Sequence, residues 1–406
     1  MRRALLGVPL AVTTLLAACS SSSPAVPDWR PSPPNRAIEG PGAHLQPILP
    51  IPTGRNRAAV PGSAQPPQPG ASSGAAQHKG DPRVVAKHLT APVGLALLPD
   101  GTALVGERTT GRIVRVQPQP DQPVPTVRTL HGLDTRGDGG LLDLAVSPTY
   151  LEDNLIYAYV TTRTDNRVVE FTLHGPVTPL FTGIPKGRLD NTGRIMFRPD
   201  GSLFIGTGDA GHPAAAAQQH SLAGKILHIT DIGRPAPRNP ERGSPVWASG
   251  QRVVDGLCVD PHDNTTFEVE SGGPGAPDEI NVVSKGGYYG WPRPAGVTHE
   301  PVATLPPDER APGGCAVQFG RLWVTSLDGA ALLSAPILTD GGAPRLGAFH
   351  TLLRHKYGRL RTVVAAPDGA LWLTTSNKDG HGHPISTDER VIRYVPATSD
   401  LGGAQT

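Results

Sequence analysis

The sequence predicts an all-β chain that folds as a six-bladed β-propeller, and three observations support this prediction. The folded part has almost no helical periodicity and consists of alternating apolar strands separated by Gly, Pro, Asp and Asn turns. Six segments repeat one plan of strand, turn and strand at intervals of roughly 50 residues. Three of these segments carry the same Pro-Asp-Gly turn at the equivalent place. Each segment is too small to bury its faces alone, so the segments must pack on one another, and radial packing of such sheets gives a propeller.

The six repeated segments cover most of the chain after residue 80. They are residues 93–116, 141–173, 193–211, 254–271, 315–337 and 360–380. A β-sandwich would have fewer, more evenly spaced strands and would not explain the repeat. We expect residues 83–89 to add an outer strand to the sheet that contains residues 360–396, because this closure joins the chain ends and removes an exposed edge.

The first 80 residues differ in composition from the rest. Residues 1–19 combine a positive start, a short apolar core and the ending Leu-Ala-Ala-Cys, which predicts a lipoprotein signal with a lipobox and lipidation of Cys19. An ordinary signal peptide with a chance cysteine is the alternative. Residues 20–80 are rich in Pro, Ser, Gly and Ala and predict a disordered stalk. The propeller is then expected over residues 81–398, with a flexible tail at 399–406.

The charge and the cysteine content indicate which partners to exclude and where to expect a disulfide. The formal net charge is +2 and there is no basic run, so nucleic acid is not an expected partner. Two cysteines remain beside Cys19, and in an oxidising exterior we expect a disulfide between Cys258 and Cys315. Two buried unpaired thiols are the alternative.

Several motifs between residues 83 and 396 carry a resemblance to one family. They include GRIMFRPDGSLFIGTGDAG, SGQRVVDGLCVDP, PDEINVVSKGGYYGWP and GRLRTVVAAPDGALWLTT, in this order. Together they resemble the soluble quinoprotein glucose and aldose sugar dehydrogenases, also called the glucose/sorbosone dehydrogenase family. Actinobacterial lipoproteins look similar over the same range. The resemblance implies a propeller that binds pyrroloquinoline quinone (PQQ) and Ca²⁺ at one end of its axial channel and oxidises a sugar at the anomeric carbon.

The resemblance assigns the catalytic base to a position that differs in this chain. The family has a histidine just before the Gly-Arg pair, and Asp190 stands there in LDNTGR. A carboxylate can act as a base if burial raises its pKa from about 4. The alternative is that Asp190 or Asn191 only bonds nearby backbone in an Asx-turn.

The cofactor site implied by the resemblance is partly retained. Arg252, Arg359 and Arg361 match family arginines that face the quinone, and a planar guanidinium suits a carboxylate of PQQ. The two arginines of GRLR are expected to share one strand face, with an exposed face as the alternative. Asp138 replaces a family glutamine at the cofactor. Further departures are Val253 for Asn, Asp328 for Lys and Ala210 for Gln.

Calcium ligands follow from the same resemblance. Gly273 and Pro274 match the pair whose backbone oxygens bind the calcium of PQQ, with one residue of altered spacing. Asp278, Glu279 and the carbonyl of Tyr289 match a second calcium site, and oxygen ligands at turns suit this hard cation. The alternative is that the acidic pair caps a turn. The tryptophans Trp291, Trp323 and Trp372 are expected in the core.

These observations lead to one main hypothesis and two rivals. The main one is a PQQ- and Ca²⁺-dependent sugar dehydrogenase-like oxidoreductase, tethered outside the cell membrane by its lipid, with a sugar substrate and an external electron acceptor as partners. The first rival is a catalytically inactive propeller that serves as a binding or cell-envelope module, which the charge reversals favour. The second is a hydrolytic lactonase-type propeller, which accounts for Asp190 but leaves the DEIN…GWP resemblance unexplained.

Overall fold

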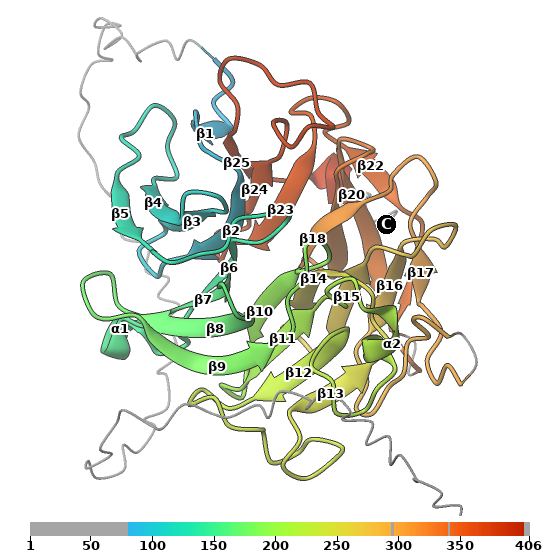
Figure 1. Ribbon diagram of the computed structural model, residues 1–406. Coiled ribbons are helices and arrows are strands. Elements are labelled where there is room, and N and C mark those ends of the chain that lie inside the picture. Colours follow the sequence, from blue (N-terminus) through green and yellow to red (C-terminus); the bar gives the residue numbers. More distant parts are fainter. Residues whose placement is uncertain (1–79, 294–295, 340–341, 402–406) are drawn as a thin grey trace, which may run out of the picture.

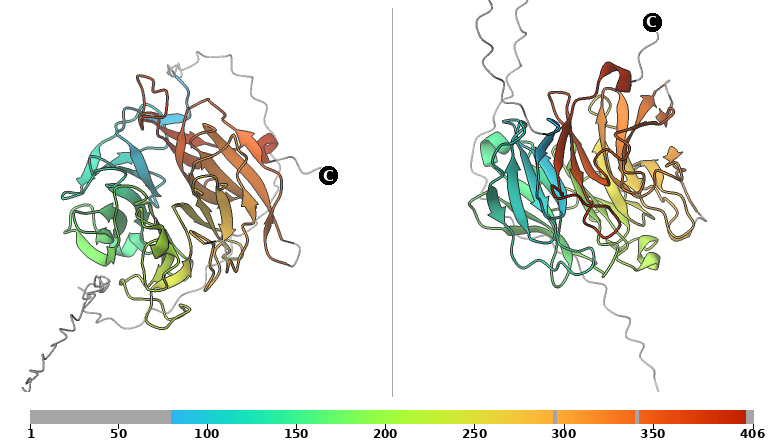
Figure 2. Two further views of the ribbon diagram at one scale, coloured as in Figure 1. Left: turned by 45° about the vertical axis from the view of Figure 1, so that its right-hand side comes forward. Right: turned by 90° about the horizontal axis from the view of Figure 1, so that it is seen from above.

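Six antiparallel sheets lie around one central axis in the computed structural model, which describes residues 80–293, 296–339 and 342–401 (Figure 1). Five sheets have four strands and one has five. Figure 2 shows the same ring of sheets from two further directions. The predicted six-bladed β-propeller is therefore confirmed.

The first three blades follow one another along the chain. Blade 1 contains β2 (Pro92–Leu97), β3 (Ala103–Glu107), β4 (Arg112–Val116) and β5 (Thr126–Thr129). Blade 2 contains β6 (Leu141–Val146), β7 (Ile156–Thr161), β8 (Asn166–Phe171) and β9 (Thr178–Ile184), with the short helix α1 (Tyr150–Asp153). Blade 3 contains β10 (Gly193–Phe197), β11 (Leu203–Thr207), β12 (Lys225–Ile229) and β13 (Val246–Ser249), with the short helix α2 (Pro213–Ala216).

The other three blades complete the ring. Blade 4 contains β14 (Val254–Val259), β15 (Thr266–Glu270), β16 (Glu279–Val282) and β17 (Ala303–Thr304). Blade 5 contains β18 (Pro312–Gln318), β19 (Arg321–Ser326), β20 (Ala331–Leu338), β21 (Arg345–Leu346) and β22 (His350–Leu352). Blade 6 contains β23 (Leu360–Ala365), β24 (Leu371–Thr375), β25 (Val391–Tyr394) and β1 (Val84–Ala86).

The ring closes as the sequence predicts. Strand β1 pairs antiparallel with β25, with Val84 opposite Ile392 and Ala86 opposite Val391. The first strand of the folded part is therefore the outer strand of the last blade, and the edge of β25 is covered.

The repeated Pro-Asp-Gly turns form the same hairpin in blades 1, 3 and 6. In each turn the aspartate accepts a hydrogen bond from the backbone N–H two residues later: Asp100 from Thr102 (3.0 Å), Asp200 from Ser202 (3.1 Å) and Asp368 from Ala370 (3.1 Å). The glycine between them has a positive φ of 79–87°. Asp and Gly therefore fix the turn that joins the first two strands of the blade.

The hydrophobic core is divided among the six blade interfaces. Each cluster of buried apolar side chains combines residues from two neighbouring blades. The cluster between blades 3 and 4 is the smallest, with Phe204, Ile226, Ala248, Val254 and Tyr289 as its buried members. No blade buries its faces alone, which is the physical reason for the repeat.

A disulfide joins blades 4 and 5. Cys258 of β14 and Cys315 of β18 are bonded, with their Cα atoms 5.7 Å apart, as the sequence analysis expects. Both residues are also part of the apolar cluster between these blades.

The ends of the propeller differ slightly from the expected boundaries. The structure continues past residue 398 into a 3-10 helix, η1 (Thr398–Leu401), and Arg321 donates to the Leu401 carbonyl at 3.1 Å. The predicted signal segment, Cys19 and residues 20–79 of the stalk lie outside the described residues, as do residues 402–406. Among the described residues, no helix has the length and apolarity needed to cross a bilayer.

Candidate functional site

A polar cavity of about 160 Å³ lies at the end of the axial channel where the innermost strand of each blade begins. It is lined by residues from five of the six blades. They are Val93, Arg108, Asp138, Leu142, Thr192, Gly193, Arg194, Val253, Asp255 and Arg361. Three arginines against two aspartates give this cavity a positive balance, which favours an anionic ligand.

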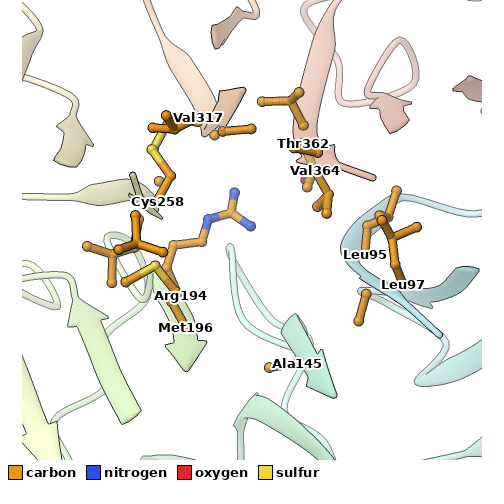
Figure 3. A pocket seen from close by; sticks show the side chains of 18 of the residues that line it. Leu95, Leu97, Ala145, Arg194, Met196, Cys258, Val317, Thr362 and Val364 are labelled. Carbon is orange, nitrogen blue, oxygen red and sulfur yellow. A yellow bond between two sulfur atoms is a disulfide. The ribbon is translucent and has the colours of Figure 1, made fainter. Parts of the chain in front are cut away.

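Arg194 separates this cavity from a larger one deeper in the channel. Its Nε donates to the carbonyl of Asp255 at 2.5 Å, and one Nη donates to the carbonyl of Gly313 at 2.5 Å. The other Nη lies 3.7 Å from Asp143. The deeper cavity measures about 680 Å³ and is mostly apolar, and Figure 3 shows the Arg194 guanidinium pointing into it.

Asp190 and Arg252 meet beside the polar cavity. Arg252 Nη2 lies 3.4 Å from Asp190 Oδ1, although 62 residues separate them. The same guanidinium donates to the Gly272 carbonyl at 2.9 Å. Two of the residues expected at the cofactor site therefore share one ion pair.

Asp190 and Asn191 divide the two roles that the sequence leaves open. Asn191 is buried; its amide donates to the Gly187 carbonyl at 2.8 Å and accepts from the Gly187 N–H at 2.8 Å. It also donates to Asp138 at 2.6 Å. Asn191 therefore fastens the turn, while the Asp190 carboxylate is directed to Arg252. The Asp138 carboxylate accepts from Asn191 through both oxygens, so it braces this turn from blade 2.

The surroundings of Asp190 favour its neutral form. Burial is the largest cause and raises the pKa of this carboxyl, and the negative charges of Asp209 and Asp138 raise it further. The Arg252 guanidinium acts in the opposite direction. A carboxylate with a raised pKa is a better general base than an exposed one.

Trp291 belongs to the site instead of the core expected for it. Its indole Nε1–H donates to Asp209 Oδ2 at 2.7 Å, and its ring lies 5.8 Å from the Arg252 guanidinium carbon. Trp323 and Trp372 are buried, as expected. Asp209 is buried too and lies in the loop after β11, so it links the tryptophan to the charge cluster around Asp190.

Arg359 and Arg361 have different surroundings although two positions separate them. Arg359 donates to Asp328 and to Asp379, each at 2.8 Å. Arg361 lines the polar cavity, and its buried Nε has no hydrogen-bond partner. The charge reversal at Asp328 is therefore compensated by Arg359, and Arg361 is the arginine of the pair with an open donor.

The calcium ligands expected from the sequence also divide into two groups. Gly273 follows the Gly272 carbonyl that Arg252 contacts, so the Gly273–Pro274 pair lies at the same site. Both oxygens of Asp278 accept from backbone, one from Gly272 N–H at 2.9 Å and one from Ala311 N–H at 2.8 Å. Asp278 thus caps the turn, which is the alternative role stated for it.

Glu279 and Tyr289 lie between blades 3 and 4. Glu279 pairs in register with Glu270 of β15, and burial raises its pKa. The Tyr289 hydroxyl donates to the Val282 carbonyl at 2.6 Å. Among the described residues, no three His, Cys, Asp or Glu side chains converge as a metal site, so calcium ligands there have to include amide or main-chain oxygens.

Sequence reasoning missed four residues of this site: Arg108, Arg194, Asp209 and Trp291. Arg108 and Arg194 line the polar cavity from blades 1 and 3. Arg194, Asp209 and Trp291 have a sequence signal, because they stand in the motifs GRIMFRPDGSLFIGTGDAG and PDEINVVSKGGYYGWP that support the resemblance. Arg108 stands in none of these motifs, and its place depends on which blades meet at the channel.

Comparisons with known proteins agree with this geometry. A family model described as Glucose / Sorbosone dehydrogenase matches residues 89–332. The PQQ-bound aldose sugar dehydrogenase of Streptomyces coelicolor is 38% identical and has a TM-score of 0.72, over 77% of this chain and 96% of that one. The putative oxidoreductase (glucose dehydrogenase) of Thermus thermophilus is 36% identical with a TM-score of 0.71, over 76% of this chain and 98% of that one.

A curated relative covers a shorter segment. Quinoprotein glucose dehydrogenase B of Acinetobacter calcoaceticus is 30% identical over 258 residues, which are 53% of this chain and 53% of the relative. The chain thus spans about half the length of this relative.

Proposed function

Because this chain belongs to the glucose/sorbosone dehydrogenase family, we propose that it is a PQQ- and Ca²⁺-dependent oxidoreductase that oxidises an aldose at the anomeric carbon. The observation that carries the proposal is the ion pair of Asp190 and Arg252 beside an arginine-lined cavity. It joins a candidate base to candidate anion-binding groups at one end of the channel.

The residues present fit an anionic quinone such as PQQ, which has three carboxylates. Arg361 offers a buried Nε without a partner, which is costly unless a ligand accepts from it. Arg252 offers a guanidinium already directed to the site. Of the two aspartates that replace neutral or positive family residues, Asp328 forms an ion pair with Arg359, and Asp138 accepts hydrogen bonds from the neutral Asn191.

Asp190 would take the proton in this reaction. The anomeric C–H bond breaks and its hydride leaves to the oxidant, while the hydroxyl proton of the same carbon moves to the Asp190 carboxylate and a lactone forms. Bound PQQ supplies the two-electron acceptor for the hydride. Arg252 holds Asp190 in place and stabilises its charged form before the transfer, and burial favours the protonated form after it.

The calcium part of the proposal rests on oxygen groups at two places. The Gly273–Pro274 pair lies beside Arg252 and would hold a cation next to the anionic cofactor. Glu279 and the Tyr289 carbonyl would hold a second cation between blades 3 and 4. Glu268 Oε2 and Asn281 Oδ1, on the same pair of strands as Glu279, are buried without hydrogen-bond partners, and a bound cation would satisfy such oxygens.

Titration of the purified protein with PQQ and Ca²⁺ tests the proposal, together with dye-linked oxidation of a panel of aldoses. We expect the tryptophan fluorescence to change on binding, because the Trp291 ring lies 5.8 Å from the Arg252 guanidinium carbon. Asp190→Asn should lower kcat by about 10²–10⁴-fold and leave PQQ affinity within about threefold. Asp190→His should restore activity, since imidazole titrates nearer neutral pH.

Asp263→Asn is the matched control, because Asp263 lies in the exposed turn between β14 and β15 and should change neither quantity. If the wild type binds no PQQ at micromolar concentration with Ca²⁺ present, the enzyme proposal fails. A protein that binds PQQ but oxidises no aldose would instead support a binding module.

We further propose that the protein is held outside the cell membrane by a lipid on Cys19, on the strength of the lipobox in the sequence. Its electrons would then pass to an external acceptor. Cys19→Ala should move the protein from the membrane fraction to the soluble fraction, and unchanged sedimentation would contradict the anchor.

A further inference from the structure

The larger cavity of the axial channel, which we call the deep cavity, has no part in the proposed dehydrogenase reaction. It measures about 680 Å³, and all six blades contribute residues to its lining. Most of these residues are apolar, and Figure 3 shows Leu95, Leu97, Met196, Val317 and Val364 around it. A mostly apolar pocket of this size with a few polar groups is typical of a site for a small organic ligand.

The deep cavity opens at the end of the channel that lies opposite the polar cavity. Pro261, Phe319 and Pro367 line it just beyond the ends of β14, β18 and β23, and Phe319 is 55% exposed. The polar cavity lies where these strands begin, and Arg194 lines both cavities. A ligand can therefore enter the deep cavity without passing through the polar cavity.

Four side chains of its lining carry nitrogen or oxygen: Asp143, Arg194, Gln318 and Thr362. Thr362 Oγ1 and Gln318 Nε2 donate to backbone carbonyls of the channel at 2.6 and 3.0 Å. The other polar atom of Gln318, Oε1, is buried away from any ligand. Asp143 and Arg194 therefore remain as the polar pair of the deep cavity.

Asp143 and Arg194 present an acceptor and a donor side by side. Arg194 uses Nε and one Nη for backbone carbonyls, and its other Nη lies 3.7 Å from Asp143 Oδ1. This distance is too long for a direct hydrogen bond, but one oxygen atom at about 2.8 Å from each of the two atoms fits beside them. Asp143 Oδ2 accepts from the Ile195 N–H at 3.0 Å, which fixes the direction of the carboxylate. Asp143 lines the deep cavity and not the polar one, so the exposed 11% of its side chain faces the deep cavity.

A group that satisfies both members of this pair has to accept one hydrogen bond and donate another. A hydroxyl group does both, whereas an ether or a ketone offers no donor. A carboxylate also offers no donor, and it would place a second negative charge beside Asp143. Since Arg194 and Asp143 together have no net charge, a neutral head group suits them better than an ion. The apolar walls hold water poorly and favour a hydrocarbon.

We propose that the deep cavity binds an apolar molecule with one hydroxyl group, such as a medium-chain primary alcohol. The hydroxyl oxygen accepts from Arg194, its O–H donates to Asp143, and the hydrocarbon part packs against the channel walls. This second ligand site lies at the other end of the channel from the polar cavity, so the inference goes beyond the proposed dehydrogenase function and does not depend on it.

Calorimetric titration of the purified protein with 1-hexanol, 1-heptanol and 1-octanol, at pH 8 and without PQQ, tests the proposal. The Asp143 carboxylate is charged at this pH, because burial raises its pKa to about 6. We expect saturable binding, and each added methylene should lower the Kd about fourfold. The compound 1-methoxyheptane is an isomer of 1-octanol without the O–H group. It should bind about 10-fold more weakly or worse, because it leaves Asp143 without a donor, and so should octanoate.

Asp143→Asn separates a ligand contact from a merely structural role. The amide oxygen keeps the bond from the Ile195 N–H, and the amide NH₂ then faces Arg194. The variant offers the ligand donors only, so its preference for 1-octanol over 1-methoxyheptane should fall to within about threefold. A structural role would change the two affinities equally.

Val364→Phe tests the hydrocarbon part of the site. Val364 is half-buried and lines the deep cavity, so a phenyl ring there takes up space that the ligand needs. Binding of 1-octanol should weaken by about 10-fold or more, while a PQQ titration should not change, because Val364 does not line the polar cavity. Val395→Phe is the matched control: it makes the same change at an exposed residue outside both cavities and should bind 1-octanol as the wild type does.

The proposal is overturned if the wild type shows no saturable binding of 1-octanol up to its solubility limit, which would mean that the deep cavity holds only water. It is equally overturned if 1-methoxyheptane or octanoate binds as tightly as 1-octanol, or if Asp143→Asn keeps the wild-type preference. Normal binding of 1-octanol by Val364→Phe would place the ligand elsewhere. Because PQQ is absent from the titrations with alcohols, failure of the dehydrogenase proposal changes none of these outcomes.

Discussion

We expect the guanidinium of Arg361 to contribute to PQQ binding, because it offers the polar cavity a donor without a partner. Its Nε is buried and unpaired, and burial followed by the charge of Arg194 lowers its pKa. Arg361→Met keeps most of the side-chain volume and removes the charged group. The substitution therefore isolates the donor that the polar cavity offers to an anion.

The expected size follows from the hydrogen bond that the guanidinium would donate. A hydrogen bond to a charged group contributes about 1.5–3 kcal/mol, which corresponds to about 10- to 150-fold in Kd. We expect Arg361→Met to weaken PQQ binding by this factor in an absorbance or fluorescence titration. Without PQQ, its thermal unfolding midpoint should stay close to that of the wild type, since the loss of the unpaired Nε donor is offset by the loss of the positive charge that faces the Asp255 carboxylate.

Arg359→Met is the control with the opposite signature. Arg359 already donates to Asp328 and Asp379, so its removal leaves two carboxylates unpaired and should lower the unfolding midpoint slightly. PQQ affinity should change less than threefold. If Arg361→Met binds PQQ as tightly as the wild type does, the role assigned to Arg361 is refuted. If Arg359→Met loses more PQQ affinity than Arg361→Met, the roles of the two arginines are reversed.

Three further results are expected. Replacing Cys258 and Cys315 by Ser should lower the free energy of unfolding by about 4 kcal/mol in denaturant titrations, because 57 residues separate them; a loss below about 1 kcal/mol would contradict the loop-entropy reasoning. Burial raises the pKa of Asp143 to about 6, so its folded form retains a proton that the unfolded chain loses near 3.8. Its stabilising effect is therefore fully present below pH 3.8 and lost as the pH rises to 6, and Asp143→Asn should flatten the fall in stability measured over this range; an unchanged slope would refute it. Asp328→Lys should replace a negative charge by a positive one while Arg359 stays paired with Asp379, and should tighten PQQ binding in the same titration; weaker binding would show that the native pair already serves the ligand.

The fold was predictable because it is repeated and locally determined. The Asp-Gly turns at Asp100, Asp200 and Asp368 use the same backbone bond, and the alternation of apolar residues fixes which strand face meets the next blade. The closing pair of β1 and β25 also follows, because a ring of such sheets leaves one edge that only the other chain end can cover.

The sequence predicted those residues of the site that stand at motif positions, but not the partners that other blades bring to them. Arg252 and Asp190 match motif positions, and the structure brings them to 3.4 Å. The partners of Arg359 were not predictable, because Asp328 and Asp379 come from different blades and their approach depends on loop geometry. Spacing of two along the chain therefore did not give the two arginines of GRLR the same surroundings.

The two aspartates that replace family residues at the channel, Asp138 and Asp328, can be explained when each is considered together with its hydrogen-bond partner. Asp138 taken alone is unfavourable near an anionic cofactor, but it accepts from Asn191 and thereby leaves the neighbouring carboxylate of Asp190 available for Arg252. Asp328 taken alone is equally unfavourable, yet it engages Arg359 and leaves Arg361 as the arginine with an open donor. Asp328 is neutralised by an arginine and Asp138 is hydrogen-bonded by a neutral amide, while the groups facing the polar cavity keep a positive balance. Asp138 and Asp328 each replace a family residue that suits an anionic cofactor. With their contacts taken into account, the remaining arginines of the site are still directed toward an anion.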